Sequence, residues 1–174
     1  ELAARWRAEK RFPFQFHFAG SGPKESQLIK RSKSLISEGR VFFHGQIGRD
    51  AVDQLLATAD LALVPNRPSS LVACPYKAGE YAAAGLPILS CLGGELGELL
   101  KHWNAGSGYK QGDVESLYNA FENYLLNPDL SKQQSLNARK MSEALFDRQI
   151  CYPQLTTFIT ALVDQPNAAH TVLD

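Results

Sequence analysis

The chain has 174 residues, of which 44% are hydrophobic and 21% are charged. These values are close to globular averages, so the composition excludes a disordered or fibrous chain and favours one soluble domain. Lysine and arginine together number 18, as do aspartate and glutamate. Because this balance leaves no overall positive charge, we do not expect a dedicated nucleic-acid-binding protein.

The three cysteines, Cys74, Cys91 and Cys151, form neither a closely spaced pair nor an even set. We therefore expect no disulfide framework, no metal site and no cofactor. No apolar run approaches the roughly 18 residues that cross a bilayer, and the first residues lack the apolar core of a signal peptide. We expect a cytoplasmic protein. Since the sequence starts at Glu1 in the middle of a pattern, we also expect a piece of a longer protein.

Short apolar runs alternate with helical patterns along most of the chain. The aromatic run at 14–20 predicts a buried strand, and Pro23 and Gly39 bracket a predicted helix within 21–39. The same unit then recurs. In chain order it predicts a strand at 41–45, a helix at 49–59, a strand at 60–65, a helix at 76–85, a strand at 86–91 and a helix at 96–103.

The last third of the chain is predominantly helical. An edge strand is predicted at 107–111, followed by a helix at 113–126 with Asp113 as its N-cap. Pro128 interrupts the pattern, which then continues as helix to about residue 164. Because 165–174 looks like a loose tail, the predicted domain spans residues 1–164.

Apolar strands separated by helices are typical of parallel βαβ units. Since such crossovers are right-handed, they predict a doubly wound, mostly parallel sheet: a Rossmann-like, three-layer α/β/α fold. Ligands of such folds bind beyond the carboxyl ends of the strands. Four segments should reach that edge, namely AGSGP, HGQIG, the loop leading into CPYKAGE, and CLGGE.

The segment CPYKAGE carries the strongest site signal. Pro75 in the first helical turn leaves the backbone N–H groups of Tyr76 and Lys77 free, and the helix dipole favours an anion there. Lys77 adds a positive charge, and Glu80 can accept two hydrogen bonds from the vicinal hydroxyls of a ribose. A phosphate beside a diol describes a nucleotide. The alternative is that Lys77 and Glu80 form only a surface ion pair.

Other candidate residues give weaker signals. Gly20 and Gly22 follow a strand and would let the backbone approach a ligand, although a tight strand-to-helix turn is the alternative. His44 at a strand end is placed to approach a ligand, whereas His17 is expected in the core and His102 to pack beside its neighbour. No nucleophile set can be assembled, so we assign no catalytic residue.

Five ordered blocks of the sequence resemble the carboxyl-terminal, donor-binding half of glycosyltransferase family 4 (group 1) enzymes, which have the GT-B fold. The resemblance covers about residues 14 to 126, and its most specific part is a glutamate followed by a small-residue turn, GLP, a strand and GG. The blocks are FHFAGSGP, VFFHGQIGRDAVDQLLATADLALVP, YKAGEYAAAGLPILS, GGELGELL and GYKQGDVESL.

The resemblance implies retaining transfer of a sugar from a UDP-, GDP- or ADP-sugar to a glycan or lipid-linked acceptor. It implies that the amides of Tyr76 and Lys77 hold the donor diphosphate, that Glu80 binds the ribose, and that Gly45, Gln46 and Ile47 line the base pocket. The family often has another glutamate eight positions before Glu80, where this sequence has Val72. Lys77 would then take over part of that residue's role.

The family's acceptor-binding domain lies upstream of this chain. We therefore expect the piece alone to bind nucleotide weakly and to turn nothing over, while the whole enzyme could lie peripherally at the inner membrane surface. Two alternatives stay open. One is a nucleotide-sugar epimerase or hydrolase of the same two-domain fold, because such enzymes share the donor half. The other is a non-catalytic α/β binding module, which the strand ends FAGSG and LVPNR do not favour because they lack paired carboxylates.

Overall fold

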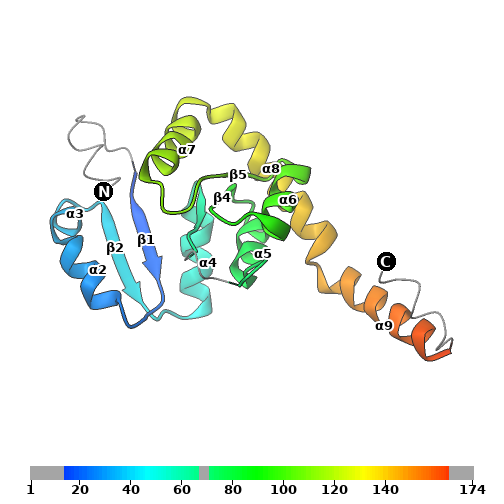
Figure 1. The fold of residues 1–174 in the computed structure, drawn as a ribbon. Coiled ribbons are helices and arrows are strands. Elements are labelled where there is room, and N and C mark those ends of the chain that lie inside the picture. Colours follow the sequence, from blue (N-terminus) through cyan, green and yellow to red (C-terminus); the bar gives the residue numbers. More distant parts are fainter. Residues whose placement is uncertain (1–13, 67–70, 165–174) are drawn as a thin grey trace.

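The structure, a computed structural model, describes residues 14–66 and 71–164, and the predicted tail lies outside these residues (Figure 1). The strands are β1 (Phe16–Ala19), β2 (Val41–Gly45), β3 (Ala62–Val64), β4 (Ile88–Ser90) and β5 (Gly106–Gly108). The helices are α2 (Glu25–Arg31), α3 (Lys33–Ser37), α4 (Arg49–Thr58), α5 (Tyr76–Ala83), α6 (Gly94–Trp103), α7 (Val114–Leu126), α8 (Pro128–Leu145) and α9 (Arg148–Asp164).

All strand pairs in the described chain are parallel. β1 pairs with β2, and β3, β4 and β5 form a second group in that order. The predicted order of strands and helices is confirmed, as is the fold class of an open parallel α/β structure of Rossmann type. Among the described residues, no helix combines the length and the apolar character needed to cross a bilayer.

Helices cover both faces of the central strands. Ile88 of β4 is buried in a cluster with residues of α5, α6 and α8, whereas its neighbour Leu89 is buried in a second cluster with residues of α7. Successive residues of a strand point to opposite faces, so the two clusters are the two sides of a three-layer arrangement. The small side chains Ala78 and Ala82 let α5 pack closely onto this core.

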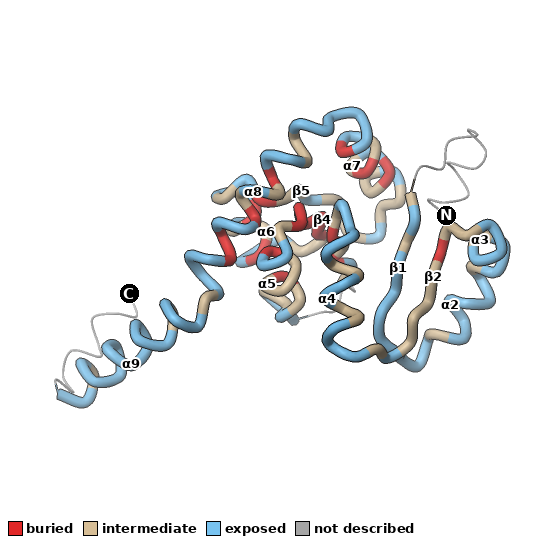
Figure 2. The backbone as a smooth tube through the Cα atoms, turned by 180° about the vertical axis from the view of Figure 1, so that it is seen from behind, coloured by how far each residue is buried: buried red, intermediate tan, exposed pale blue. Residues whose placement is uncertain are grey.

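The first strand is present but is not buried as predicted. Three of the four residues of β1 are exposed, and Phe18 retains 42% of its accessible surface (Figure 2). Only its first part packs inward, where Phe16 contacts Phe121 of α7 with a ring-centroid separation of 5.6 Å. The aromatic composition therefore indicated a strand correctly but not its environment.

The predicted helix at 21–39 is in fact two short helices. The chain turns at Ser32 between α2 and α3, where the Ser32 N–H donates to the carbonyls of both Leu28 and Ile29. This shared hydrogen bond tightens the last turn of α2 and ends it. Pro23 precedes the first helical residue, Glu25, by two positions.

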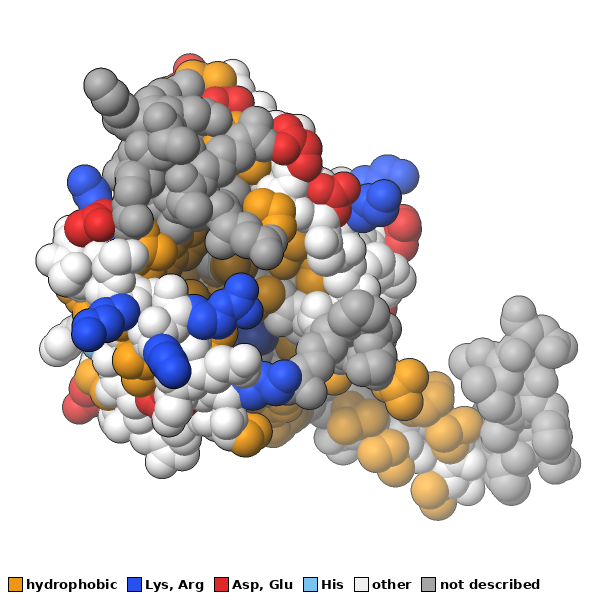
Figure 3. Space-filling model, turned by 60° about the vertical axis from the view of Figure 1, so that its left-hand side comes forward, with side chains coloured by type: hydrophobic (Ala, Val, Ile, Leu, Met, Phe, Trp, Pro, Cys, Tyr) orange, Lys and Arg blue, Asp and Glu red, His pale blue; other side chains and the backbone are white. Residues whose placement is uncertain are grey.

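The carboxyl-terminal helices follow the predicted breaks. The Asp113 side chain accepts a hydrogen bond from the Ser116 N–H at 3.0 Å, which confirms the N-cap of α7, and Pro128 begins α8. α9 then extends away from the body and has no buried residue (Figure 1). Figure 3 shows hydrophobic side chains along this extension, and the exposed ones include Tyr152, Leu155, Phe158, Ile159 and Val163.

Candidate functional site

The ends of β1 and β2 meet through two glycines. The Gly20 N–H donates to the Gly45 carbonyl at 2.6 Å, and both residues have positive φ, 118° and 63°. Glycine is favoured there because other side chains are strained in this region. A Cβ on either residue, or on Gly22, would meet nothing within 4 Å, so all three face open space. This geometry agrees with a tight strand-to-helix turn that leaves the backbone accessible.

The amino terminus of α5 begins without a side-chain cap from its N-cap residue. Pro75 is the N-cap residue rather than the first helical residue, and its carbonyl accepts from the Ala78 N–H at 2.8 Å. The N–H groups of Tyr76 and Lys77 precede that first helical bond, and the side chain of the N-cap residue Pro75 does not cap them. The Tyr76 side chain is 88% exposed, so it does not cover the helix end. Two backbone donors and the positive end of the helix dipole therefore lie together at this end of α5.

Glu80 lies one turn further along α5 and is held by a residue from another helix. Its Oε1 accepts a hydrogen bond from Nη1 of Arg49 at 2.8 Å, while the Glu80 side chain keeps 39% of its accessible surface. The alternative of a Lys77–Glu80 ion pair is not what the described residues show. Its partial exposure shows that Glu80 is not buried in the core. Arg49 is the first residue of α4 and follows the carboxyl end of β2 by only a short loop, so a side chain that contacts Arg49 points toward that edge of the strands.

Arg49 is in turn fixed by its own helix. Its Nε lies 3.0 Å from Oδ1 and 3.2 Å from Oδ2 of Asp53, one helical turn away. Hydrogen bonding to Asp53, followed by the charges of Asp53 and Glu80, raises the pKa of Arg49, so the guanidinium stays charged. Sequence reasoning did not find Arg49. The i,i+4 spacing of Arg49 and Asp53 was available as a signal, but the contact with Glu80 spans 31 residues and needs the fold.

The remaining predicted base-pocket residues lie in the same connection. Gln46 is exposed and Ile47 is half-buried, between Gly45 and the first residue of α4. The structure therefore brings this loop and the middle of α5 together through Arg49. Position 72, where the family often has a glutamate, carries an exposed valine.

The chain after β3 is tied to the end of β4. The Asn66 N–H donates to Sγ of Cys91 at 3.0 Å, and the Gln111 side chain donates to the Asn66 carbonyl at 2.8 Å. Burial, and then hydrogen bonding with Cys91, raises the pKa of Tyr109 well above its usual range. Residues 67–70, which follow, lie outside the described residues.

His17 is exposed rather than buried, which corrects the expectation of a core histidine. Its Nδ1 lies 3.0 Å from Nε2 of His44, and the two rings stack with an interplanar angle of 9°. Partial burial and the neighbouring His44 lower the pKa of His17. His102 contacts Trp103 edge-on, as expected of a packing residue. The described residues contain no group of three or more His, Cys, Asp or Glu side chains arranged to hold a metal ion.

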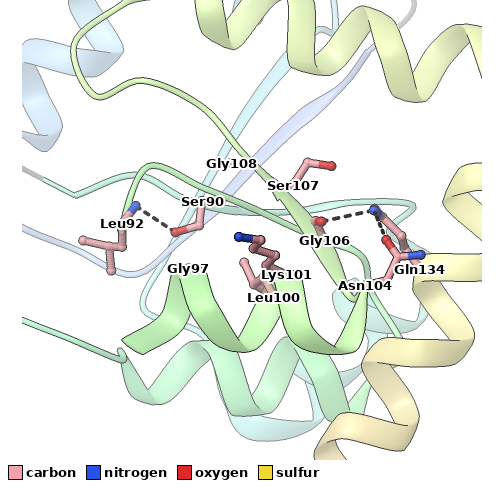
Figure 4. A pocket seen from close by; sticks show the side chains of 10 residues that line it. All are labelled: Ser90, Leu92, Gly97, Leu100, Lys101, Asn104, Gly106, Ser107, Gly108 and Gln134. Atoms are coloured by element: carbon pink, nitrogen blue, oxygen red, sulfur yellow. Dashed lines mark hydrogen bonds between the residues drawn. The ribbon is translucent and has the colours of Figure 1, made fainter. Parts of the chain in front are cut away.

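A cavity of about 460 Å³ lies elsewhere, between α6 and the strands β4 and β5 (Figure 4). Lys101 of α6 points into it, and the side chain of Gln134 closes one end by donating to Asn104 and to the Gly106 carbonyl. None of the predicted site residues lines this cavity. Its lining does include Ser90, Leu92 and Gly108, which lie at or just after the carboxyl ends of β4 and β5.

The model of the family described as "Glycosyl transferases group 1" matches residues 1–141. The chain is 25% identical over 125 residues to chitobiosyldiphosphodolichol beta-mannosyltransferase of Debaryomyces hansenii, covering 71% of this chain and 26% of that protein. It is 29% identical over 133 residues to glycogen synthase of Mycobacterium tuberculosis, covering 75% and 31% respectively. The chain thus spans about a quarter to a third of these relatives.

Solved structures give the same fold. Anabaena Alr3699/HepE in complex with UDP-glucose matches with a TM-score of 0.75 at 19% identity, covering 92% of this chain and 44% of that one. Sucrose-phosphate synthase from Thermosynechococcus elongatus matches with a TM-score of 0.67 at 25% identity, covering 94% and 42%. Because the family model matches most of the chain, and the parallel α/β fold agrees with it, the chain belongs to the group 1 glycosyl transferases.

Proposed function

We propose that residues 1–164 are the donor-binding domain of a retaining glycosyltransferase. The whole enzyme would take a sugar from a nucleotide-sugar donor and transfer it to a glycan or a lipid-linked acceptor. Family membership supports sugar transfer. The observation that carries the donor role is the half-exposed carboxylate of Glu80, one turn from the two uncapped amides that open α5.

The proposed roles follow from charge and hydrogen-bonding capacity. The donor diphosphate would accept from the N–H groups of Tyr76 and Lys77, and the Lys77 ammonium would offset its charge. Negative charge builds on the diphosphate as the bond between sugar and phosphate breaks. Donors that are already oriented stabilise this charge with little reorganisation. Glu80 would accept hydrogen bonds from the two ribose hydroxyls.

The loops at the strand ends would hold the rest of the nucleotide. Gly45, Gln46 and Ile47 would line the base pocket, and the open backbone around Gly20 and Gly22 would face the phosphates. Two solved relatives support a uridine nucleotide as the first ligand to test. Anabaena Alr3699/HepE is in complex with UDP-glucose, and the pneumococcal O-GlcNAc transferase GtfA is in complex with UDP and GlcNAc.

The whole protein's activity would need more than this chain. We propose an acceptor-binding domain upstream in the full protein, because the chain covers less than half of the relatives named above. Without it nothing positions the acceptor or excludes water, so residues 1–174 would bind donor weakly and transfer nothing. If the acceptor is lipid-linked, the full protein would act in the cytoplasm at the inner membrane surface.

Calorimetric titration of the folded chain with UDP, GDP and ADP tests the site. We expect binding of at least one of them, and Glu80→Gln should weaken it about tenfold to a hundredfold, since hydrogen bonds to a charged group are lost. The matched control is Glu143→Gln, which removes another half-exposed, arginine-paired glutamate, on α8. Absence of heat with all three nucleotides, or equal losses in both variants, would refute the assignment.

Lys77→Ala separates the phosphate contact from the ribose contact. This change should weaken UDP more than uridine, because uridine carries no diphosphate, whereas Glu80→Gln should weaken both. A product assay on the full-length enzyme then distinguishes transfer from the related alternatives. Transfer yields an elongated acceptor, hydrolysis yields free sugar, and epimerisation yields an altered nucleotide-sugar.

A further inference from the structure

We propose that Arg49 is a positioning residue that fixes the carboxylate of Glu80, and that the site selects ribose over deoxyribose nucleotides because of it. This inference rests on the proposed function of Glu80 and adds a residue from a different helix to the same site. It starts from the 2.8 Å hydrogen bond between Arg49 Nη1 and Glu80 Oε1.

The guanidinium is itself oriented before it reaches Glu80. Asp53 binds Nε of Arg49 from one helical turn away, at 3.0 and 3.2 Å to its two carboxylate oxygens. The planar guanidinium presents its donors in a fixed fork, so binding at Nε also sets the direction of Nη1. Asp53, Arg49 and Glu80 therefore form a chain in which each member restricts the rotation of the next.

The contact leaves Glu80 able to bind a second partner. Arg49 occupies Oε1 from one direction, and a carboxylate offers about four acceptor positions on its two oxygens. A vicinal diol needs two of these in a fixed orientation. A glutamate side chain that rotates freely loses conformational entropy when it binds the diol, and this loss weakens binding. A side chain that Arg49 already holds in place loses less entropy. Arg49 thus makes the diol contact selective without touching the ribose.

The pair also balances charge next to an anionic ligand. An isolated Glu80 would repel a diphosphate bound at the start of the same helix, and Asp53 would add to that repulsion. Arg49 lies between the two carboxylates and offsets them, while Lys77 stands at the helix end. Both half-exposed partners stay reachable from solvent, since Arg49 keeps 66% and Glu80 39% of their accessible surface.

The test compares the tightest-binding nucleotide among UDP, GDP and ADP with its 2′-deoxy counterpart, by titration followed with amide NMR. In the wild-type chain the ribose form should bind about tenfold or more tightly, because one hydrogen bond to a carboxylate is lost in the deoxy form. We call the affinity for the ribose nucleotide divided by the affinity for its 2′-deoxy counterpart the ribose ratio. Arg49→Ala should bring the ribose ratio close to one. Arg49→Lys keeps the charge but not the fork, so it should keep more of the overall affinity and still lower the ratio.

Arg139→Ala is the matched control. Arg139 also forms an i,i+4 pair, with Glu143, and also reaches α5, where it donates to the Ala83 carbonyl at 2.7 Å at the opposite end of the helix. It should leave the ribose ratio unchanged. The positioning role is overturned if Arg49→Ala or Arg49→Lys keeps the wild-type ribose ratio. It is also overturned if Arg139→Ala lowers the ribose ratio as much as Arg49→Ala does.

Failure of the two proposals gives different results. If the wild-type chain binds no nucleotide, or if Glu80→Gln keeps the full ribose ratio, the proposed donor site itself is wrong and the role of Arg49 falls with it. If Glu80→Gln abolishes the ratio while both Arg49 variants keep it, the donor site stands and only the positioning role is wrong. Asp53→Ala, which removes the acceptor that orients Arg49, should lower the ratio in the same direction as Arg49→Ala.

Discussion

Gly106 lies so close to Ile88 that a Cβ added to Gly106 would come within 2.0 Å of the Ile88 carbonyl oxygen. The neighbour is backbone of the central strand β4 and cannot move aside as a flexible side chain would. Gly106 is the partner of Ile88 where β5 pairs with β4, and it also lines the cavity beside α6.

Gly106→Ala should therefore lower the free energy of unfolding by about 3 kcal/mol or more, because the extra methyl group separates the two strands. Urea denaturation followed by circular dichroism measures the loss. Gly22→Ala is the control, since its Cβ would meet nothing within 4 Å and its φ is not positive. A loss of similar size in both variants would contradict the close-contact explanation.

The buried hydroxyl of Tyr124 gives a second prediction. It donates to Oε1 of Gln134 at 2.5 Å and lies 3.0 Å from the Ser107 hydroxyl. Tyr124→Phe leaves the buried Gln134 oxygen without this donor, which should cost about 1–3 kcal/mol of stability. Tyr152→Phe, at an exposed position of α9, should change stability by less than about 0.5 kcal/mol. Thermal melting of both variants checks the difference.

Removal of the Asp113 cap should weaken α7. Asp113→Ala is expected to cost about 1 kcal/mol, since the Ser116 N–H loses its side-chain acceptor at the helix start. Asp113→Ser retains an oxygen that can cap the helix and should restore most of the loss. Equal stabilities of the alanine and serine variants, measured in urea, would show that the side-chain hydrogen bond contributes nothing.

The histidine pair makes stability depend on pH. Burial and His44 hold the pKa of His17 below its usual value, so the unfolded chain binds this proton more readily than the folded one. The stabilisation is complete above the ordinary histidine pKa of about 6.5 and is lost as pH falls through the lowered folded value. Acid should therefore favour unfolding across this range.

His17→Gln should flatten that dependence, which urea denaturation between pH 7.5 and pH 5 would measure. His102→Gln, whose ring contacts Trp103 instead of another histidine, serves as the comparison. If the His17 variant keeps the full wild-type slope, the paired rings are not its source.

Local sequence signals were sufficient to predict most of the helices and strands, and they are also the basis on which the α5 amides and Glu80 are proposed as site residues. Apolar runs located β1 to β4, and the edge strand predicted at 107–111 overlaps β5 at Gly106–Gly108. Asp113 and Pro128 marked helix starts, and Pro75 marked the start of α5. These features depend on residues only a few positions apart. The roles proposed for the α5 amides and for Glu80 rest on the same kind of local signal.

Features that depend on distant residues could not be predicted. Arg49 and Glu80 are 31 positions apart in the sequence, and the residue types around Glu80 do not indicate a partner on another helix. His17 was expected in the core because it lies in an aromatic run, yet the exposure of β1 depends on which helices cover it. Ser32 ends α2 through a shared hydrogen bond that no single residue type specifies.

The separation of the strands into two hydrogen-bonded groups has a mechanical consequence. Gly20 and Gly45 lie at the ends of the strands of the first group, whereas Glu80 lies on α5, which connects β3 and β4 of the second group. The proposed site therefore spans the boundary between the two groups. Side chains bridge that boundary, among them the Phe16–Phe121 rings and the Arg49–Glu80 pair. A nucleotide bound to both strand groups would stabilise each of them against local opening. Hydrogen exchange of the backbone amides in β1 and β2 would then slow, even at residues that the nucleotide does not contact.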